Sequence, residues 1–191
     1  MELIFATNNP NKVTEIQQKL NDRYTIKSLR DIGFDDDIPE DFETLKENAE
    51  VKADTIYKIT GKNCFADDTG LEVDALNGEP GVYSARYAGI HGDAKANMKK
   101  LLQNLDGVEN RTARFKTVIC LILNGEKFFF EGIAEGEITK EESGAEGFGY
   151  DPIFKPKSYN ITFAEMPLTE KNKISHRAKA FEKMLSHLNR E

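Results

Sequence analysis

Two long strand-like stretches meet at an Asn-Gly pair, and this arrangement constrains the fold more than any other feature of the chain. The stretches are Arg114–Leu123 and Lys127–Ile138, with Asn124-Gly125 lying between them. An Asn-Gly pair between two such stretches is the strongest short-range signal for a two-residue β-hairpin. The sequence therefore predicts a long antiparallel hairpin, around which the other elements must assemble.

Four amphipathic patterns predict helices. Three of them begin at typical helix starts, namely Asn9-Pro10, the capping-box form Thr44–Glu47, and Asp93. The second is expected to run from about Thr44 to Ile59. The apolar residues on the four faces are Val13, Ile16 and Leu20; Leu45, Ala49, Ala53 and Ile56; Ala94, Met98, Leu101 and Leu105; and Ile174, Ala178, Phe181, Leu185 and Leu188.

Short strands are predicted between these helices, at Leu3–Ala6, Asn63–Ala66 and Leu71–Leu76. Helices interleaved with strands, together with one hairpin, indicate an α/β fold with a mixed sheet. The chain has 191 residues and neither an internal repeat nor a low-complexity linker. We therefore expect one domain covering residues 1–191, with room for two lobes.

Composition excludes several classes of function. The formal net charge of −7 does not fit general binding to nucleic acid polymers, which requires a basic surface. The longest apolar run, Val118–Leu123, is far shorter than a membrane span of roughly 20 residues. Cys64 and Cys120 lack metal-ligand spacing and cannot form a disulfide framework. We expect a reduced, cytoplasmic protein that does not bind membranes.

The first candidate site is Thr7–Lys12, between a predicted strand and a predicted helix. A helix N-terminus offers backbone N–H groups and the positive end of the helix dipole, which suit a phosphate. Thr7 and Asn8 can add hydrogen bonds, and Lys12 can add a full charge. The alternative interpretation is that Asn9 only caps the helix and Lys12 is a solvated surface residue. The segment lacks the glycines of a Walker loop.

The second candidate is the acidic pair Asp67-Asp68 at the end of a predicted short strand. Neighbouring side chains in an extended segment point in different directions, so one of the two is expected to face a given site. A carboxylate there can hold Mg²⁺, which prefers oxygen ligands; the alternative is an acidic turn. Asp68-Thr69-Gly70 also matches the short signature of aspartic proteases, but those enzymes are all-β and the predicted helices contradict that class.

Three further segments each leave two interpretations open. Around the second predicted helix, Glu40 can approach a metal and Lys52 an anion, or both are surface residues. In Gly147–Asp151, Phe148 can stack on a base and Asp151 can accept hydrogen bonds from one, or the aromatic residues pack into the core. Lys171–Arg177, placed at the start of the last helix, is either a functional basic segment or an exposed cap.

Taken in order along the chain, these segments resemble the inosine triphosphate pyrophosphatase family, enzymes that remove non-standard purine nucleoside triphosphates. The resemblance covers essentially the whole chain. It implies a long mixed sheet flanked by helices, two lobes with a nucleotide cleft between them, and a homodimer. The matching segments are Ala6–Lys12, Glu40, Glu47–Ala49, Lys52-Ala53, Ala66–Leu71, Pro80–Tyr87, Gly147–Phe154 and Ile174–Arg177.

The resemblance also implies roles for individual residues. Asp68 is the expected proton acceptor and, with Glu40, a ligand of Mg²⁺. The remaining expected contacts are all with the substrate. They are Thr7, Asn8, Asn9, Pro10, Asn11 and Lys12 on the triphosphate, Lys52 on the phosphate side, Thr69, and Phe148, Gly149, Tyr150, Asp151, Lys171, His176 and Arg177 for the nucleotide and base.

The implied reaction is Mg²⁺-dependent hydrolysis of dITP, ITP and XTP to the monophosphate and pyrophosphate. A 6-oxo group accepts hydrogen bonds from donors such as His176 or Arg177, whereas the 6-amino group of adenine cannot. The chain departs from the family pattern at two places. One is Asp41–Glu43, which stands in place of a more usual Thr-Gly pair and leaves the geometry around Glu40 open. The other is Thr69 where Ser is common.

Two other functions stay open at this point. One is a pyrophosphatase for modified pyrimidine nucleoside triphosphates on a similar fold. The other is a catalytically silent nucleotide-binding module. The joint presence of Glu40, Asp68 and Lys52 disfavours the second, because a sensor does not need paired metal-binding carboxylates.

Overall fold

A computed structural model describes residues 1–19 and 23–190 of the chain. The predicted helix residue Leu20 lies outside the described residues. The elements are β1 (Glu2–Phe5), α1 (Pro10–Gln17), β2 (Thr25–Ser28), η1 (Arg30–Ile32), α2 (Leu45–Thr60), β3 (Cys64–Val73), η2 (Asp74–Leu76), β4 (Pro80–Gly81), η3 (Ser84–Arg86), α3 (Ala94–Asn104), β5 (Thr112–Leu123), β6 (Glu126–Ile138), η4 (Asp151–Ile153), β7 (Phe154–Pro156), η5 (Phe163–Glu165), α4 (Leu168–Ile174) and α5 (His176–Leu188).

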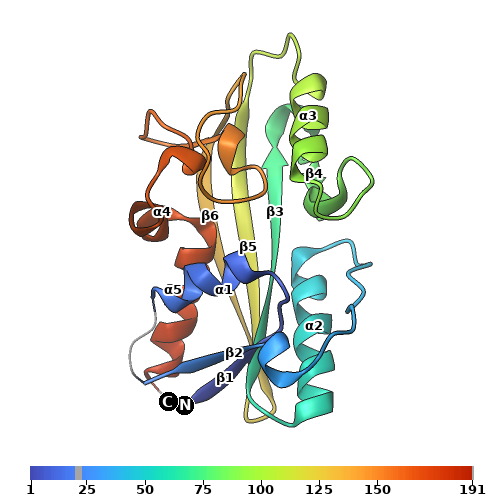
Figure 1. Cartoon of the computed structure of the whole chain (residues 1–191), viewed down its shortest axis with the longest axis vertical. Helices are drawn as coiled ribbons and strands as arrows, with labels where there is room; N and C mark the ends of the chain where they lie inside the picture. The colour runs from blue at the N-terminus through green and yellow to red at the C-terminus, as the bar shows by residue number, and fades with distance from the viewer. Residues whose placement is uncertain (20–22, 191) are drawn as a thin grey trace. The chain divides into compact units, whose positions relative to one another are not determined.

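The strands form one mixed sheet in the order β2-β1-β3-β5-β6-β7, and β4 pairs with β3 outside this path (Figure 1). Strand β1 runs parallel to both β2 and β3, whereas the β3–β4 and β6–β7 pairs are antiparallel. The predicted α/β fold with a mixed sheet is therefore confirmed. No helix in the described part of the chain is long and apolar enough to cross a membrane.

The chain divides into two compact units. Unit 1 comprises Met1–Asp68, Thr117–Gly132 and Arg177–Glu191, and unit 2 comprises Thr69–Lys116 and Ile133–His176. Each of β3, β5 and β6 contributes residues to both units, so neither unit is a single continuous stretch of sequence.

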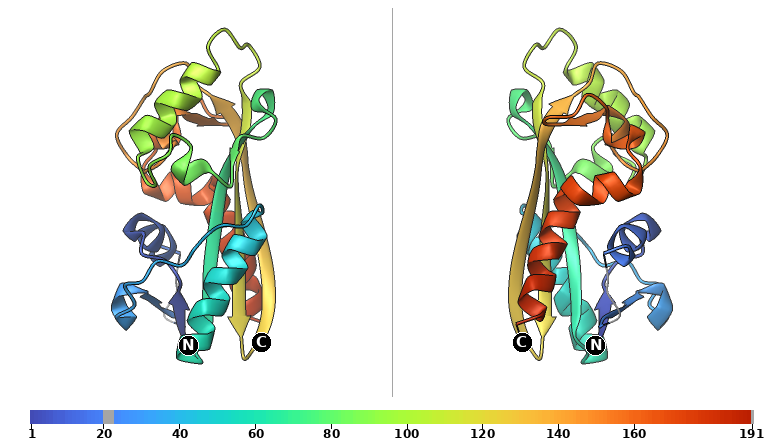
Figure 2. Two further views of the ribbon diagram at one scale, coloured as in Figure 1. Left: turned by 90° about the vertical axis from the view of Figure 1, so that its right-hand side faces the viewer. Right: turned by 90° about the vertical axis from the view of Figure 1, so that its left-hand side faces the viewer.

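Unit 1 has a core on each face of its part of the sheet, because successive strand residues point to opposite sides. On one face, Phe5 and Phe65 pack with Phe181 of α5. On the other face, Ile4 and Ala66 pack with Ala53 of α2. Helices α2 and α5 accordingly lie on opposite faces of the sheet (Figure 2).

Unit 2 has its own core, in which a group of aromatic side chains packs around Phe115. Phe115 of β5 lies 4.7 Å from Phe154 and 6.2 Å from Phe163, measured between ring centroids. Met98 and Leu101 of α3 join the same cluster, as the helical spacing predicted.

The helix caps and the hairpin turn that the sequence predicts are confirmed. The side chains of Asn9, Thr44 and Asp93 each accept a hydrogen bond from a backbone N–H at the start of α1, α2 and α3 respectively. Asn124 and Gly125 adopt φ values of 52° and 89°, as a type I′ hairpin turn requires, and they join β5 to β6. Local hydrogen bonding and backbone preference were therefore sufficient to predict these positions.

Two predicted boundaries are wrong. The strands predicted at Asn63–Ala66 and Leu71–Leu76 are one continuous strand, β3, that runs through the acidic pair and ends at Val73. The last predicted helix is two helices, α4 and α5, separated at Ser175, whose ψ of 153° is extended. Lys171–Arg177 therefore does not start one helix but spans this break. Ile174 packs in the core of unit 2, whereas Phe181 packs in that of unit 1, so the regular apolar spacing across Ser175 does not mark one face.

Candidate active site

The loop from β1 to α1 folds around its own side chains. Thr7 accepts a hydrogen bond from the backbone N–H of Asn9, and Asn9 accepts one from Asn11. Pro10 occupies the first turn of α1, while Asn8, Pro10 and Asn11 are exposed. The loop thus presents the N-terminal end of α1 to solvent, and the predicted role of Asn9 as a cap is confirmed.

Lys12 does not extend into solvent. Its Nζ atom donates to Oδ1 of Asp67 at 2.8 Å, and its side chain is only 15% exposed. The interpretation of Lys12 as a solvated surface residue is therefore wrong.

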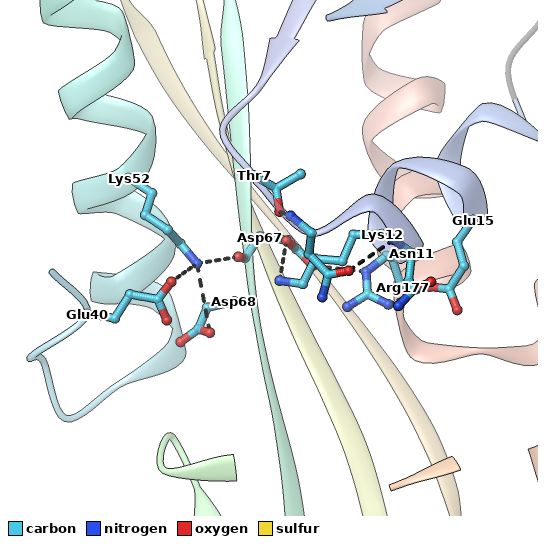
Figure 3. A network of polar contacts seen from close by, with 10 residues as sticks. Thr7, Asn11, Lys12, Glu15, Glu40, Lys52, Asp67, Asp68 and Arg177 are labelled. Carbon is cyan, nitrogen blue, oxygen red and sulfur yellow. Dashed lines mark hydrogen bonds and ion pairs between the residues drawn. The ribbon is translucent and has the colours of Figure 1, made fainter. Parts of the chain in front are cut away.

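Asp67 and Asp68 point to opposite faces of β3, as strand alternation predicted (Figure 3). Asp67 shares the side of Phe65, which faces α1 and α5, and Asp68 shares the side of Ala66, which faces α2. Both carboxylates are buried, at 1% and 7% exposure. The acidic turn that was the alternative is not formed.

On the first face, Asp67 is the centre of a buried charge network that we call the Asp67 network. Its carboxylate accepts hydrogen bonds from Lys12 and, at 3.0 Å, from Nε of Arg177, whose Nη1 donates to Glu15. Burial by itself raises the pKa of Asp67, but the positive charges of Lys12 and Arg177 outweigh it and hold this pKa well below its usual range. Asp67 is therefore expected to be ionised at neutral pH and to form ion pairs with both Lys12 and Arg177.

On the second face, Lys52 is the centre of another network, which we call the Lys52 network. Its Nζ atom donates to Glu40 Oε1 at 2.7 Å and to the backbone carbonyl of Asp67 at 2.7 Å, and it lies 4.0 Å from Asp68 Oδ1. Burial lowers the pKa of Lys52, but Glu40 and Asp68 raise it above its ordinary value overall. The two carboxylates thus converge on one buried ammonium group.

Asp68 differs from Asp67 in its titration. Burial raises the pKa of Asp68, Lys52 lowers it, and the neighbouring negative charge of Glu40 raises it, with a net increase. A carboxylate with a raised pKa is a better proton acceptor than an ordinary one. This direction agrees with the role of proton acceptor that the resemblance implies for Asp68, and the role itself stays a prediction.

The donor set of the Lys52 network fits Mg²⁺. Glu40 and Asp68 supply carboxylate oxygens that lie within 4.0 Å of Lys52 Nζ. Within residues 1–19 and 23–190, no group of three or more His, Cys, Asp or Glu side chains is placed to hold a metal by itself. Mg²⁺ is usually held by one or two carboxylates together with water and substrate phosphates, rather than by an all-protein cage.

Unit 2 holds a separate cluster of predicted site residues around Asp151. Oδ2 of Asp151 accepts a hydrogen bond from the backbone N–H of Phe148 at 2.8 Å and from Lys171 Nζ at 2.7 Å. The Lys171 ammonium lies 5.0 Å from the centroid of the half-buried Phe148 ring and 5.5 Å from that of Phe163. These contacts fix a half-buried aromatic ring beside a buried cation.

Other residues that the resemblance predicts to contact the substrate also make contacts within the protein. Tyr150 is 5% exposed and its hydroxyl donates to the backbone carbonyl of Ser84, so the interpretation of core packing holds for this ring. His176 is 4% exposed and stacks on Phe115, with centroids 4.5 Å apart. Thr69 and Gly149 are half-buried. His176 lies in unit 2, whereas Arg177, the next residue, belongs to unit 1 and to the Asp67 network.

The sequence does not predict two members of the Asp67 network. Asp67 is expected there only as an alternative to Asp68, although alternation along an extended strand requires each of them to face a different side. Glu15 lies one helical turn after Lys12 on α1, and no local signal distinguishes it from an exposed helix residue. Its role depends on Arg177, which lies 162 residues further along the chain.

Comparisons with known proteins agree with this architecture. Residues 3–187 match the model of the Ham1 family. A protein of Flavobacterium johnsoniae named dITP/XTP pyrophosphatase is 56% identical over 188 residues, covering 98% of each chain. A protein of Bacillus subtilis with the same name is 49% identical, covering 96% of this chain and 94% of its own.

Solved structures show the same fold. The structure of a HAM1 protein from Coxiella burnetii superposes with a TM-score of 0.91 at 38% identity and covers 100% of both chains. That of the Staphylococcus aureus Ham1 protein gives a TM-score of 0.89 at 38% identity, covering 99% of this chain and 98% of its own. The matches in sequence and in structure both extend along essentially the whole chain, and the chain belongs to the Ham1 family.

Proposed function

We propose that this chain hydrolyses the non-standard purine nucleoside triphosphates dITP, ITP and XTP to the monophosphate and pyrophosphate, and so keeps them out of DNA and RNA. A relative that is 56% identical carries the name dITP/XTP pyrophosphatase. The observation that carries the proposal is the convergence of Glu40 and Asp68 on Lys52 Nζ, at 2.7 and 4.0 Å. A binding module would not need a half-buried and a buried carboxylate that converge on one buried ammonium group.

Mg²⁺ is the proposed cofactor, and Glu40 and Asp68 are the residues that would hold it. When bound, it would neutralise negative charge on the phosphate oxygens. Side chains of the protein would carry out proton transfer, stabilisation of the leaving pyrophosphate and recognition of the base.

We assign the proton transfer to Asp68. The oxygen of a water molecule forms a bond to the α-phosphorus while the bond from this phosphorus to the bridging oxygen breaks, and pyrophosphate leaves. Asp68 accepts the proton that the water loses, for which its raised pKa suits it. Lys52 and Lys12, held by Glu40 and Asp67, supply the positive charge that the departing pyrophosphate requires.

We assign base recognition to the cluster of unit 2. The ring of Phe148 offers a face for stacking, and Lys171 and Asp151 offer a donor and an acceptor at its edge. A 6-oxo purine satisfies a fixed donor, whereas the 6-amino group of adenine would leave it unpaired. The donors His176 and Arg177 are both buried, at 4% and 2% exposure, and Arg177 already pairs with Asp67 and Glu15.

We further propose that the protein is a cytoplasmic homodimer. The family resemblance supports the dimer, and the acidic composition with two reduced, buried cysteines supports the location. Sedimentation equilibrium would test the dimer, because a monomer at micromolar concentration would contradict it.

Pyrophosphate release measures the proposed function directly. Purified protein with Mg²⁺ is assayed on dITP, XTP, dGTP and dATP, with a set of modified pyrimidine triphosphates alongside. Fast release from dITP and XTP, slow release from dGTP and dATP, and loss of release on chelation of Mg²⁺ are expected. Preference for a pyrimidine would replace the substrate class, and binding of dITP without any release would leave a binding module.

A further inference from the structure

Asn48 of α2 holds the backbone of the loop that carries Glu40. Its Oδ1 atom accepts a hydrogen bond from the N–H of Phe42 at 3.1 Å, and its Nδ2 donates to the carbonyl of the same residue at 3.2 Å. The Asn48 side chain is 1% exposed. One buried amide thus binds both polar groups of a single residue, two positions after Glu40.

The part of the loop before Glu40 is held by Phe34 and Ile38, which are half-buried and pack against a core of unit 1. Residues 34–41 form neither helix nor strand, and Asp41, Phe42 and Glu43 are all exposed. The Phe42 ring in particular is 46% exposed, so the loop is not anchored by burial of this side chain. The amide of Asn48 therefore anchors the part of the loop that follows Glu40, where the side chains are exposed.

Helical spacing connects this attachment to the Lys52 network. Asn48 and Lys52 are four residues apart on α2, so their side chains lie on the same face, one turn from each other. Asn48 binds the loop at Phe42, and Lys52 binds the carboxylate of Glu40 at 2.7 Å. Two successive turns of one helix thus hold two neighbouring points of the loop.

We propose that Asn48 is a positioning residue for the metal site: by binding both the backbone N–H and the carbonyl of Phe42, it holds the Glu40 carboxylate beside Asp68. This inference rests on the proposed function, which requires Glu40 and Asp68 to bind Mg²⁺ together. Outer residues that orient metal ligands typically change metal affinity about 10- to 100-fold when they are removed. Asn48 acts on the ligand through the backbone and not on the substrate.

The test compares Asn48→Ala with Asn97→Ala. Asn97 is an equally buried α3 residue that makes the same kind of clamp in unit 2, accepting from Ala88 N–H at 2.7 Å and donating to the Ala85 carbonyl at 3.2 Å. Binding of Mn²⁺ to each protein without nucleotide is measured by the loss of the free-ion EPR signal. Glu40→Gln serves as the variant that lacks the ligand itself.

We expect the Mn²⁺ dissociation constant to rise about 10-fold or more in Asn48→Ala and in Glu40→Gln, and to stay within about twofold of wild type in Asn97→Ala. In the assay of pyrophosphate release, Asn48→Ala should need more Mg²⁺ and regain most of its kcat at saturating Mg²⁺. A purely structural defect would lower kcat at every Mg²⁺ concentration.

Several outcomes would overturn the inference. They are an unchanged Mn²⁺ affinity in folded Asn48→Ala, an equal loss in Asn97→Ala, or no difference between wild type and Glu40→Gln. If Asn48→Ala does not fold, Asn48→Ser replaces it, since it keeps one polar group in the buried position but cannot span both atoms of Phe42. Pyrophosphate release by wild type separates the two proposals, because its absence on every purine triphosphate refutes the proposed function whatever Mn²⁺ does.

Discussion

Asp67 and Asp68 are neighbours in β3, yet their carboxylates belong to two different charge networks on opposite faces of the strand. Asp67 binds Lys12 at 2.8 Å and Arg177 at 3.0 Å, whereas Asp68 lies 4.0 Å from Lys52, which also binds Glu40. The pKa of Asp67 is lowered and that of Asp68 is raised. Two chemically identical side chains are therefore expected to give different phenotypes when they are changed in the same way.

Asp68→Asn should remove activity without unfolding the protein. The amide keeps the size of the side chain but cannot accept the proton of the attacking water, so we expect kcat for dITP to fall at least about 100-fold. Binding of dITP, measured by equilibrium dialysis, should largely persist. Release of pyrophosphate near the wild-type rate would show that another group accepts the proton.

Asp67→Asn should instead destabilise the fold. The substitution leaves Arg177 and Lys12 without the charge that compensates them, and loss of one partner of a buried ion pair typically costs about 3 kcal/mol or more. Urea denaturation of Asp67→Asn and Asp68→Asn side by side measures the difference. Equal free energies of unfolding for the two variants would contradict the assignment of Asp67 to a stabilising network.

Gly147→Ala should disturb the cluster around Asp151. A Cβ atom at Gly147 would lie 2.1 Å from Asp151 Oδ2, the oxygen that binds Phe148 N–H and Lys171. Gly149→Ala is the matched control, because Gly149 has a similar positive φ, +64° against +76°, but no atom within 4 Å of its Cβ position.

In Gly149→Ala the free energy of unfolding should fall only by the strain of a side chain in the left-handed conformation, about 1–2 kcal/mol. Gly147→Ala should lower the free energy of unfolding clearly more than Gly149→Ala does, because its Cβ atom collides with the Asp151 carboxylate. Equal losses in both variants would mean that the carboxylate moves aside at no cost.

The thiols of Cys64 and Cys120 should be unreactive in the folded protein. Both side chains have no exposed surface, and burial raises the pKa of each to about 12. Because the thiolate is the reactive species, a disulfide reagent such as DTNB at mildly alkaline pH should modify neither cysteine until guanidinium chloride unfolds the chain. Rapid modification of one thiol in the native protein would show that its strand opens locally.

Prediction from sequence succeeded where the determinant was local. The caps at Asn9, Thr44 and Asp93, the turn at Asn124-Gly125 and the apolar faces of α2 and α3 each depend on hydrogen bonds or spacings within a few residues, and these are confirmed. The order of the family motifs also identified the family, since a series of matching segments in the same order is far more specific than any one of them.

Prediction failed where distant groups decide the conformation. An acidic pair followed by Thr69-Gly70 looks like the end of a strand. Strand β3 continues because Lys12, Lys52 and Arg177, from three other elements, compensate the buried carboxylates. The break at Ser175 is likewise invisible in the apolar spacing, because Ile174 and Phe181 pack into different cores.

The sequence by itself determined most of the helices, the long hairpin, the mixed α/β class and the family, and it nominated most residues of the candidate site. Only the tertiary structure decided how the charges pair: which carboxylate faces Lys12, that Lys52 holds Glu40, and that Glu15 and Asn48 take part. The physical reason is that a buried charge or amide is stable only with a partner, and the chain brings those partners together from positions up to 162 residues apart.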